Sequence, residues 1–107
     1  MTIQSAKQRT VKDIKVEDER VQITGYVRGP IDERQFTLND ETGEIRIDIS
    51  NVDFKFKEND LINVIGELVK EGNNIKIFRA EIIQDKEKLN FDYYKKLYEL
   101  KKKYGQN

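Results

Sequence analysis

The sequence predicts an all-β fold, a five-stranded barrel in a single small domain, followed by a C-terminal α-helix. Three observations lead to this prediction. Five segments alternate between apolar and polar residues, glycines lie inside the first and fourth of them, and after residue 90 the apolar spacing becomes that of a helix. A chain of 107 residues is long enough to bury one modest core.

The alternation has a period of two, which is typical of a strand with one buried face. It is clearest in "RVQITGYVR", where every second residue is apolar or glycine. We expect strands at residues 20–28, 35–39, 44–50, 61–69 and 74–83. The apolar positions predict a core of Val21, Ile23, Val27, Phe36, Leu38, Ile45, Ile47, Ile49, Val64, Ile75 and Ile77.

Gly25 and Gly66 lie inside two of these strands. A glycine within a strand usually marks a bulge, a sharp bend or a close approach of two backbones. Because a short sheet must bend strongly to close on itself, these two glycines favour a small coiled barrel over a flat sheet.

The second and third strands are joined by a polar turn within "FTLNDETGEIRIDI", residues 36–49. We expect Gly43 to supply the positive φ of a tight antiparallel connection. Asn39, Asp40 and Thr42 can hydrogen-bond to the turn backbone. The turn therefore sets the register of the hairpin and carries no chemistry of its own.

The C-terminal segment predicts a helix over about residues 90–104. Asn90 can cap its start, Gly105 can end it, and three lysines lie in its last turn, where the helix dipole favours cations. An apolar stripe with helical spacing comprises Tyr93, Leu97, Leu100 and Tyr104, and Tyr94 and Tyr98 extend it around the helix. The stripe could pack on the barrel, but an aromatic surface of this extent also indicates a partner interface.

Composition excludes several classes of function. The chain has no cysteine and no histidine, so it lacks thiolate chemistry, the usual zinc ligands and the commonest general base. We expect no metal and no cofactor. Turn carboxylates such as Asp40 and Glu41 have no nucleophile beside them in the sequence, so an enzyme is not expected.

Charge divides the chain into a mildly acidic body and a basic tail. Residues 1–85 hold 13 basic and 17 acidic side chains, whereas residues 86–107 hold seven lysines and three acidic residues. We expect a flexible segment at 1–10, the barrel domain at 11–85 and the C-terminal helix at 86–107. No segment has the apolar length of a signal peptide core or a membrane span, which predicts an intracellular protein, in the cytoplasm, nucleoid or nucleus.

Four segments within residues 11–85 resemble the OB-fold nucleic-acid-binding family: "VQITGYV", "FTLNDETGEIRIDI", "ENDLINVIGELV" and "IKIFRAEII". The chain looks most like replication protein A small and middle subunits and their telomeric relatives. It departs from the family pattern at Asn39 and at Asn59, where Asp and Gly are common, but asparagine tolerates the left-handed backbone that such turns need. The resemblance implies that the outer face of the first three strands binds single strands. It also implies assembly with another protein subunit through the C-terminal helix.

The outer face of the first three strands carries a minimal set for binding single strands, namely cations for phosphates and a flat side chain for bases. The set is Tyr26, Arg28, Thr37 and Arg46, and Arg34, Lys55, Lys57, Lys76 and Arg79 could widen it. Each cation could instead serve only solubility and protection of sheet edges. Phe54 and Phe56 either grip nucleic acid between the flanking lysines or close the open end of the barrel.

The leading hypothesis is therefore a non-enzymatic OB-fold subunit that binds single-stranded nucleic acid, DNA in particular, within a larger assembly of the replication protein A type. The alternative is an OB-fold domain that binds only protein, which the acidic body and the small number of exposed aromatic residues support. The expected partner interface comprises Tyr93, Tyr94, Leu97, Tyr98, Leu100 and Tyr104.

Overall fold

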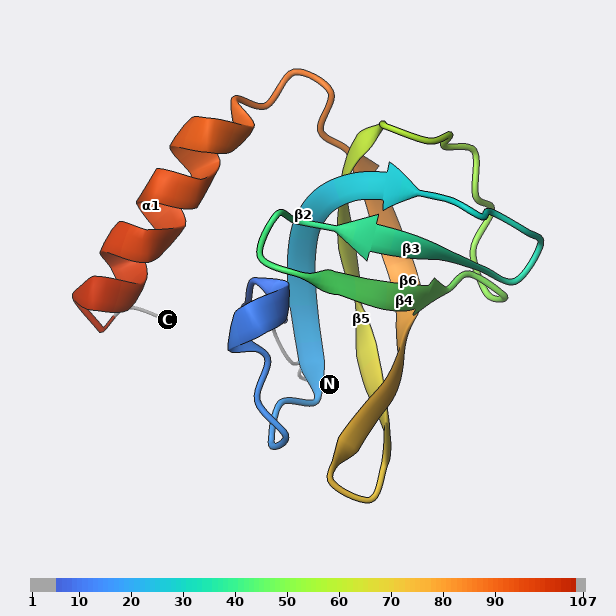
Figure 1. Ribbon diagram of the computed structural model, residues 1–107, viewed down its shortest axis with the longest axis horizontal. Coiled ribbons are helices and arrows are strands. Elements are labelled where there is room, and N and C mark those ends of the chain that lie inside the picture. The colour runs from blue at the N-terminus through green and yellow to red at the C-terminus, as the bar shows by residue number, and fades with distance from the viewer. Residues whose placement is uncertain (1–5, 106–107) are drawn as a thin grey trace, which may run out of the picture.

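The computed structural model describes residues 6–105 and contains six strands, a short 3-10 helix and one α-helix (Figure 1). Their bounds are β1 Lys7–Gln8, η1 Val11–Asp13, β2 Arg20–Arg28, β3 Gln35–Asn39, β4 Glu44–Asp48, β5 Leu61–Glu71, β6 Asn74–Asp85 and α1 Phe91–Lys103. The predicted fold class, five barrel strands followed by a C-terminal helix, is confirmed. β1 and η1 were not predicted.

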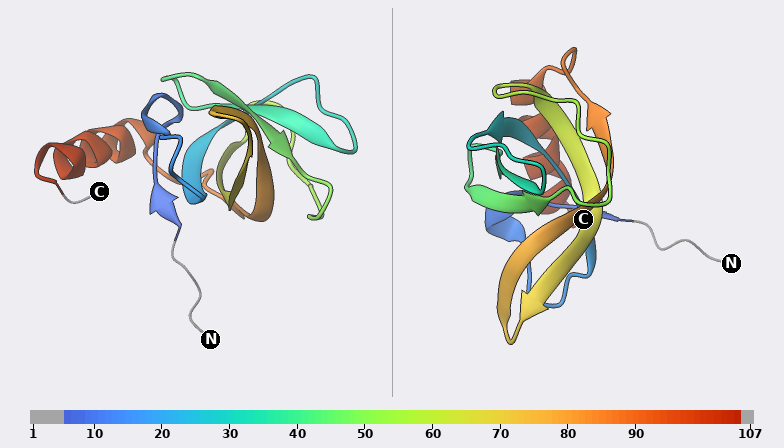
Figure 2. Two further views of the ribbon diagram at one scale, coloured as in Figure 1. Left: turned by 90° about the horizontal axis from the view of Figure 1, so that it is seen from below. Right: turned by 90° about the vertical axis from the view of Figure 1, so that its right-hand side faces the viewer.

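The strands form one sheet in the order β1-β2-β3-β4-β6-β5, and a further pairing of β2 with β5 closes it (Figures 1 and 2). β2 pairs along its last residues with β3 and along its first seven with β5, so it must bend between two neighbours. A Cβ atom on Gly66 would lie 1.9 Å from the carbonyl oxygen of Arg79, and one on Gly25 would lie 2.8 Å from that of Asn39. The two glycines therefore allow the close backbone approaches that were expected of them.

The core is largely the predicted one. Buried side chains include Val21, Ile23, Val27, Phe36, Leu38, Ile47, Ile49 and Val64, together with Ile62, Leu68, Phe78 and Ala80, which were not predicted. Ile45, Ile75 and Ile77 are only partly buried. Ile45 and Ile75 pack against the core, but the prediction was wrong for Ile77. The reason is that β6 contains two extra residues relative to β5, at Lys76 and Glu81. Each bulge moves the alternation to the opposite face, which brings Phe78 and Ala80 inward.

The β3–β4 turn differs from the prediction in one respect. The positive φ belongs to Glu41 (72°), not to Gly43. Gly43 is needed for space, since a Cβ there would lie 3.0 Å from Cγ1 of Val11. The buried Asp40 accepts hydrogen bonds from the N–H groups of Thr42 (2.9 Å) and Val11 (2.7 Å), so the turn is tied to the N-terminal segment.

The N-terminal segment is packed from residue 7 onward. β1 pairs in parallel with the start of β2, and Arg9 donates two hydrogen bonds to the buried carboxylate of Asp18, at 2.9 and 3.1 Å. The prediction of a flexible segment over residues 1–10 is therefore wrong for residues 7–10, because the Arg9–Asp18 pair anchors them. Residues 1–5 lie outside the described part of the chain.

Helix α1 begins at its predicted cap, where the side chain of Asn90 accepts a hydrogen bond from the N–H of Tyr93 at 3.0 Å. It docks through Phe91 and Tyr98, which are buried. The hydroxyl of Tyr98 donates to Asp13 at 2.9 Å and accepts from the N–H of Thr10 at 3.3 Å. Among residues 6–105, no helix is long and apolar enough to span a membrane.

The predicted apolar stripe of α1 faces away from the barrel, with Tyr93 64%, Leu97 38%, Leu100 50% and Tyr104 71% exposed. Tyr98 is 1% exposed, and the hydroxyl of the partly buried Tyr94 accepts a hydrogen bond from Gln8 at 2.6 Å. Tyr94 and Tyr98 are therefore not available to the predicted partner interface, because their hydroxyls make hydrogen bonds on the barrel side. The outer stripe, defined as Tyr93, Leu97, Leu100 and Tyr104, remains accessible.

Candidate nucleic-acid interface

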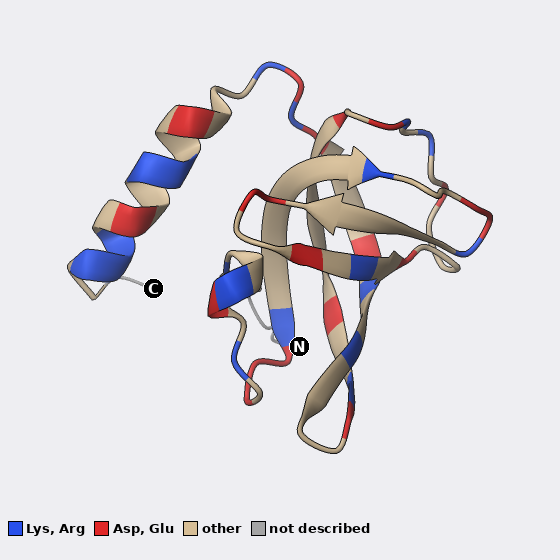
Figure 3. Ribbon diagram, viewed as in Figure 1, with Lys and Arg blue, Asp and Glu red and all other residues tan. Residues whose placement is uncertain are grey.

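Three predicted residues form a row across the outer face of β2, β3 and β4. Arg28 lies opposite Thr37, and Thr37 lies opposite Arg46, so the two arginines lie on β2 and β4, the strands that flank β3, with one hydroxyl between them. Among residues 6–105, Arg46 makes no ion pair. Figure 3 shows the Lys and Arg colour at the end of β2 and within β4. We call Arg28, Thr37 and Arg46 the basic row.

Tyr26 lies in the next row along the sheet, opposite Asn39. The guanidinium carbon of Arg28 lies 5.3 Å from the centre of the Tyr26 ring, within the range of a cation–π interaction. Arg28 also donates to Oδ1 of Asn59 at 2.6 Å, and Asn59 has a positive φ of 77°. Asn59 therefore adopts the left-handed backbone expected of it and positions the arginine above the tyrosine.

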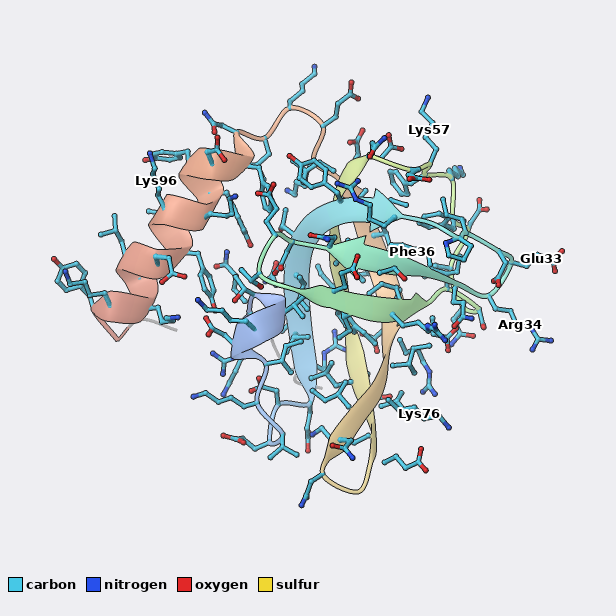
Figure 4. The ribbon with its side chains drawn as sticks, viewed as in Figure 1. Glu33, Arg34, Phe36, Lys57, Lys76 and Lys96 are labelled. Atoms are coloured by element: carbon cyan, nitrogen blue, oxygen red, sulfur yellow. The ribbon has the colours of Figure 1, made fainter. Side chains whose placement is uncertain are left out.

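The two predicted cations of β6 lie outside this arrangement. Arg79 donates to Glu67 at 3.2 Å and lies 3.8 Å from Asp48, so its charge is largely balanced. Hydrogen bonds from Ser50, with the charge of Arg79, hold the pKa of Asp48 below its usual value. Lys76 lies 3.9 Å from Glu71 at the β5–β6 hairpin, away from the labelled Phe36 on β3 (Figure 4).

The segment between β4 and β5 separates its aromatic residues from its basic ones. Phe54 stacks on Phe36 with ring centres 4.6 Å apart, and Phe56 lies 5.7 Å from Phe54. Both half-buried rings pack against the core, which favours the alternative that they close the end of the barrel. Lys55 and Lys57 are exposed.

Arg34 is exposed in the loop between β2 and β3 and points into solvent (Figure 4). The N–H groups of Arg34 and Gln35 donate to Asp32 at 2.7 and 2.9 Å, which lowers the pKa of Asp32 and fixes the loop. Arg34 and Lys57 could therefore extend the basic row only at its loop end.

Phe91 was not predicted as a residue of the site. Its ring centre lies 5.3 Å from that of Tyr26 with the planes at 88°, and its side chain is 7% exposed. A cavity of about 480 Å³ adjoins this contact. The sequence does contain one signal for Phe91. The residue directly follows the helix cap and lies on the side of the helix opposite the outer stripe.

The closed barrel followed by a C-terminal helix defines an OB-fold module. A model of the Bacterial OB fold (BOF) protein family matches residues 1–85, and the chain belongs to that family. It matches no curated protein sequence.

Solved structures share the fold at low identity. The telomere capping protein Ten1 from Saccharomyces pombe is 18% identical with a TM-score of 0.76, over 92% of this chain and 99% of that one. A chain of the S. pombe Stn1-ten1 complex is 17% identical with a TM-score of 0.76, over 94% of each chain. A chain of a replication protein A heterotrimer bound to ssDNA is 14% identical with a TM-score of 0.53, over 74% of this chain and 66% of that one.

Proposed function

We propose that this protein is a non-enzymatic subunit that binds single-stranded nucleic acid, DNA in particular, across the outer face of β2, β3 and β4. The observation that carries the proposal is the basic row beside Tyr26. Two guanidinium groups on the strands that flank β3 suit the phosphates of a single strand that crosses this face, and a neighbouring ring suits a base. Arg34, Lys55 and Lys57 extend the path at the loop end.

We further propose that the subunit works within an assembly of the replication protein A type, joined through the outer stripe of α1. The stripe leaves four large apolar side chains in water, and Lys96 and Lys103 flank it on the exposed side of the helix. An acidic amphipathic helix would bury the stripe and pair with these lysines. The likeness to chains from a Stn1-ten1 complex and from a heterotrimer supports an assembly of this kind.

The nucleic-acid proposal is tested by fluorescence anisotropy with an unstructured labelled oligonucleotide at several salt concentrations. We expect binding that weakens with salt, and a slope reduced by about 0.7–1 in each of Arg28→Ala and Arg46→Ala. Lys76→Ala is the matched control, since its charge lies beside Glu71 and off the face. Tyr26→Ala should weaken binding by about 1–3 kcal/mol.

The protein-only alternative gives a different pattern. It is supported by the net acidic body and by Asp48 and Glu44 on the same face. It predicts no oligonucleotide binding even at low salt, with partner binding through α1 intact. Changing Leu97 and Leu100 together to Glu separates the two activities, because both side chains are exposed. The double variant should lose partner association while the barrel melts as in the wild type.

A further inference from the structure

The ring of Tyr26, which the proposed function assigns to base stacking, is already in contact with a ring of the same chain. Phe91, the first residue of α1, lies 5.3 Å from Tyr26 between ring centres and is 7% exposed. Tyr26 is half-buried as a result. Such an edge-to-face pair is favourable in itself, so a base that stacks on Tyr26 must compete with Phe91.

We propose that α1 is a displaceable cover over the aromatic end of the nucleic-acid face, in which Phe91 holds the place beside Tyr26 that a nucleobase takes in the complex. This inference rests on the proposed function and adds its regulation. Docked α1 leaves the basic row open to phosphates, while base stacking on Tyr26 requires the first turn of α1 to move.

The contacts between α1 and the barrel are few enough for the helix to undock. The helix pairs with no strand, and its backbone hydrogen bonds are its own, so undocking breaks no part of the sheet. Two residues of α1 are buried, Phe91 and Tyr98. The remaining links are the hydroxyl hydrogen bonds of Tyr94 and Tyr98 and two surface ion pairs. The ion pairs run from Lys95 to Glu41 in the β3–β4 turn and from Lys102 to Asp13 at 2.9 Å. Segments held by so few buried contacts open at lower free energy than the core.

Displacement of Phe91 would also widen the adjoining cavity of about 480 Å³, whose aromatic and apolar walls outside α1 include Tyr26, Phe56 and Leu61. Its walls outside α1 also include three carboxylates: Asp60, Asp85 and Glu87. These carboxylates repel a phosphate but accept hydrogen bonds from the exocyclic amino group of a base. The cavity therefore suits an uncharged base whose phosphates stay outside at Arg28.

The cover lowers affinity by a predictable rule. If only a fraction of molecules has α1 undocked, the apparent affinity for a stacked base is reduced by that fraction. Weakening the docked state raises the fraction without touching the binding face. Lys95 and Lys102 lie on the docked side of α1, whereas Lys96 and Lys103 are exposed on the other side. Variants at Lys96 and Lys103 are therefore matched controls for variants at Lys95 and Lys102.

The experiment compares two double variants. The first carries Lys95→Glu and Lys102→Glu, and the second carries Lys96→Glu and Lys103→Glu. Both carry the same net charge, so both lose the same general attraction for an anion. The first pair places glutamate against Glu41 and Asp13 and loosens the cover. Measured by anisotropy with a labelled oligonucleotide, its affinity should exceed that of the second pair by about three- to tenfold.

Equal affinities in the two double variants would overturn the cover and leave the proposed function standing. Absence of binding at low salt in the wild type and in both variants would overturn the proposed function itself. Should the first variant unfold the barrel, amide hydrogen exchange of the wild-type chain decides. Saturating oligonucleotide should accelerate exchange in residues 91–103, because an undocked helix of this length is marginal in water. Unchanged or slower exchange would overturn the cover.

Discussion

The hydroxyl of Tyr98 is the contact whose removal tests the docking of α1 most directly. It donates to Asp13 at 2.9 Å and accepts from the N–H of Thr10 at 3.3 Å, in a site where Tyr98 is 1% exposed. Burial raises the pKa of Tyr98, and the hydrogen bond to Asp13 raises it further, so the hydroxyl keeps its proton. Tyr98→Phe removes one oxygen atom and preserves the ring.

The magnitude follows from what each partner loses. Asp13 keeps its hydrogen bond from Lys102 at 2.9 Å, so its carboxylate is not orphaned. The buried N–H of Thr10 loses its acceptor in this contact. A buried hydrogen bond to a charged group contributes about 1.5–3 kcal/mol, and we expect Tyr98→Phe to lower the free energy of docking α1 by about this amount.

The assay is amide hydrogen exchange of residues 91–103, with urea unfolding followed by circular dichroism. Tyr93→Phe is the control, since Tyr93 is 64% exposed and should change stability by less than about 0.5 kcal/mol. We expect faster exchange of α1 in Tyr98→Phe alone. If the two variants exchange α1 amides at the same rate, Tyr98 does not anchor the helix and the reasoning fails.

Three further predictions concern the barrel and the N-terminal segment that packs on it. Ile47→Ala should lower the free energy of unfolding by about 2–5 kcal/mol in urea titrations, because a fully buried side chain leaves a cavity. Gly66→Ala should cost at least about 1–3 kcal/mol in the same assay, because its Cβ would lie 1.9 Å from a carbonyl oxygen of β6. Acid should destabilise the N-terminal segment. Burial alone would raise the pKa of Asp18, but hydrogen bonds from Arg9 and the Lys15 N–H lower it overall. The resulting stability is fully present above the unfolded carboxyl pKa of about 3.9 and is lost as pH falls through the lower folded value, as a melting series below pH 5 would detect. An unchanged acid profile in Asp18→Asn would contradict this.

The barrel strands could be predicted because their signals are local. Residues 20–28 and 35–39 keep an unbroken alternation, and the structure gives them the predicted bounds. β6 could not be predicted in detail, since its two bulges depend on how it meets β5 and leave no mark in its own alternation. β1 was missed for a similar reason. Its two residues are ordered by the Arg9–Asp18 pair, which joins positions nine residues apart.

The basic row was predictable from strand parity alone, since Arg28, Thr37 and Arg46 occupy outward positions on adjacent strands. Which face of α1 docks was not predictable from spacing, because the helix has apolar residues on two sides. Hydrogen bonding decides which of the two sides docks on the barrel. A buried tyrosine hydroxyl needs a polar partner, and Gln8, Thr10 and Asp13 supply partners beside the barrel.

The small size of the basic row gives a reason for the two proposed roles of α1. Arg28 and Arg46 can neutralise about two phosphates, and Arg34, Lys55 and Lys57 add three at most, which for single strands gives a log–log salt slope of about 1.4 to 3.5. A neutral chain with so few phosphate contacts holds a single strand weakly. Joining a second binding subunit raises the effective concentration of each site for the same strand without any new contact. On the proposals above, the outer stripe of α1 supplies that connection, and its inner side, through Phe91, keeps Tyr26 covered until a base competes for it. The two roles use different residues of one helix. Leu97→Gln with Leu100→Gln, which leaves the net charge unchanged, should therefore abolish partner association yet leave the affinity of the isolated subunit for a short oligonucleotide within about twofold.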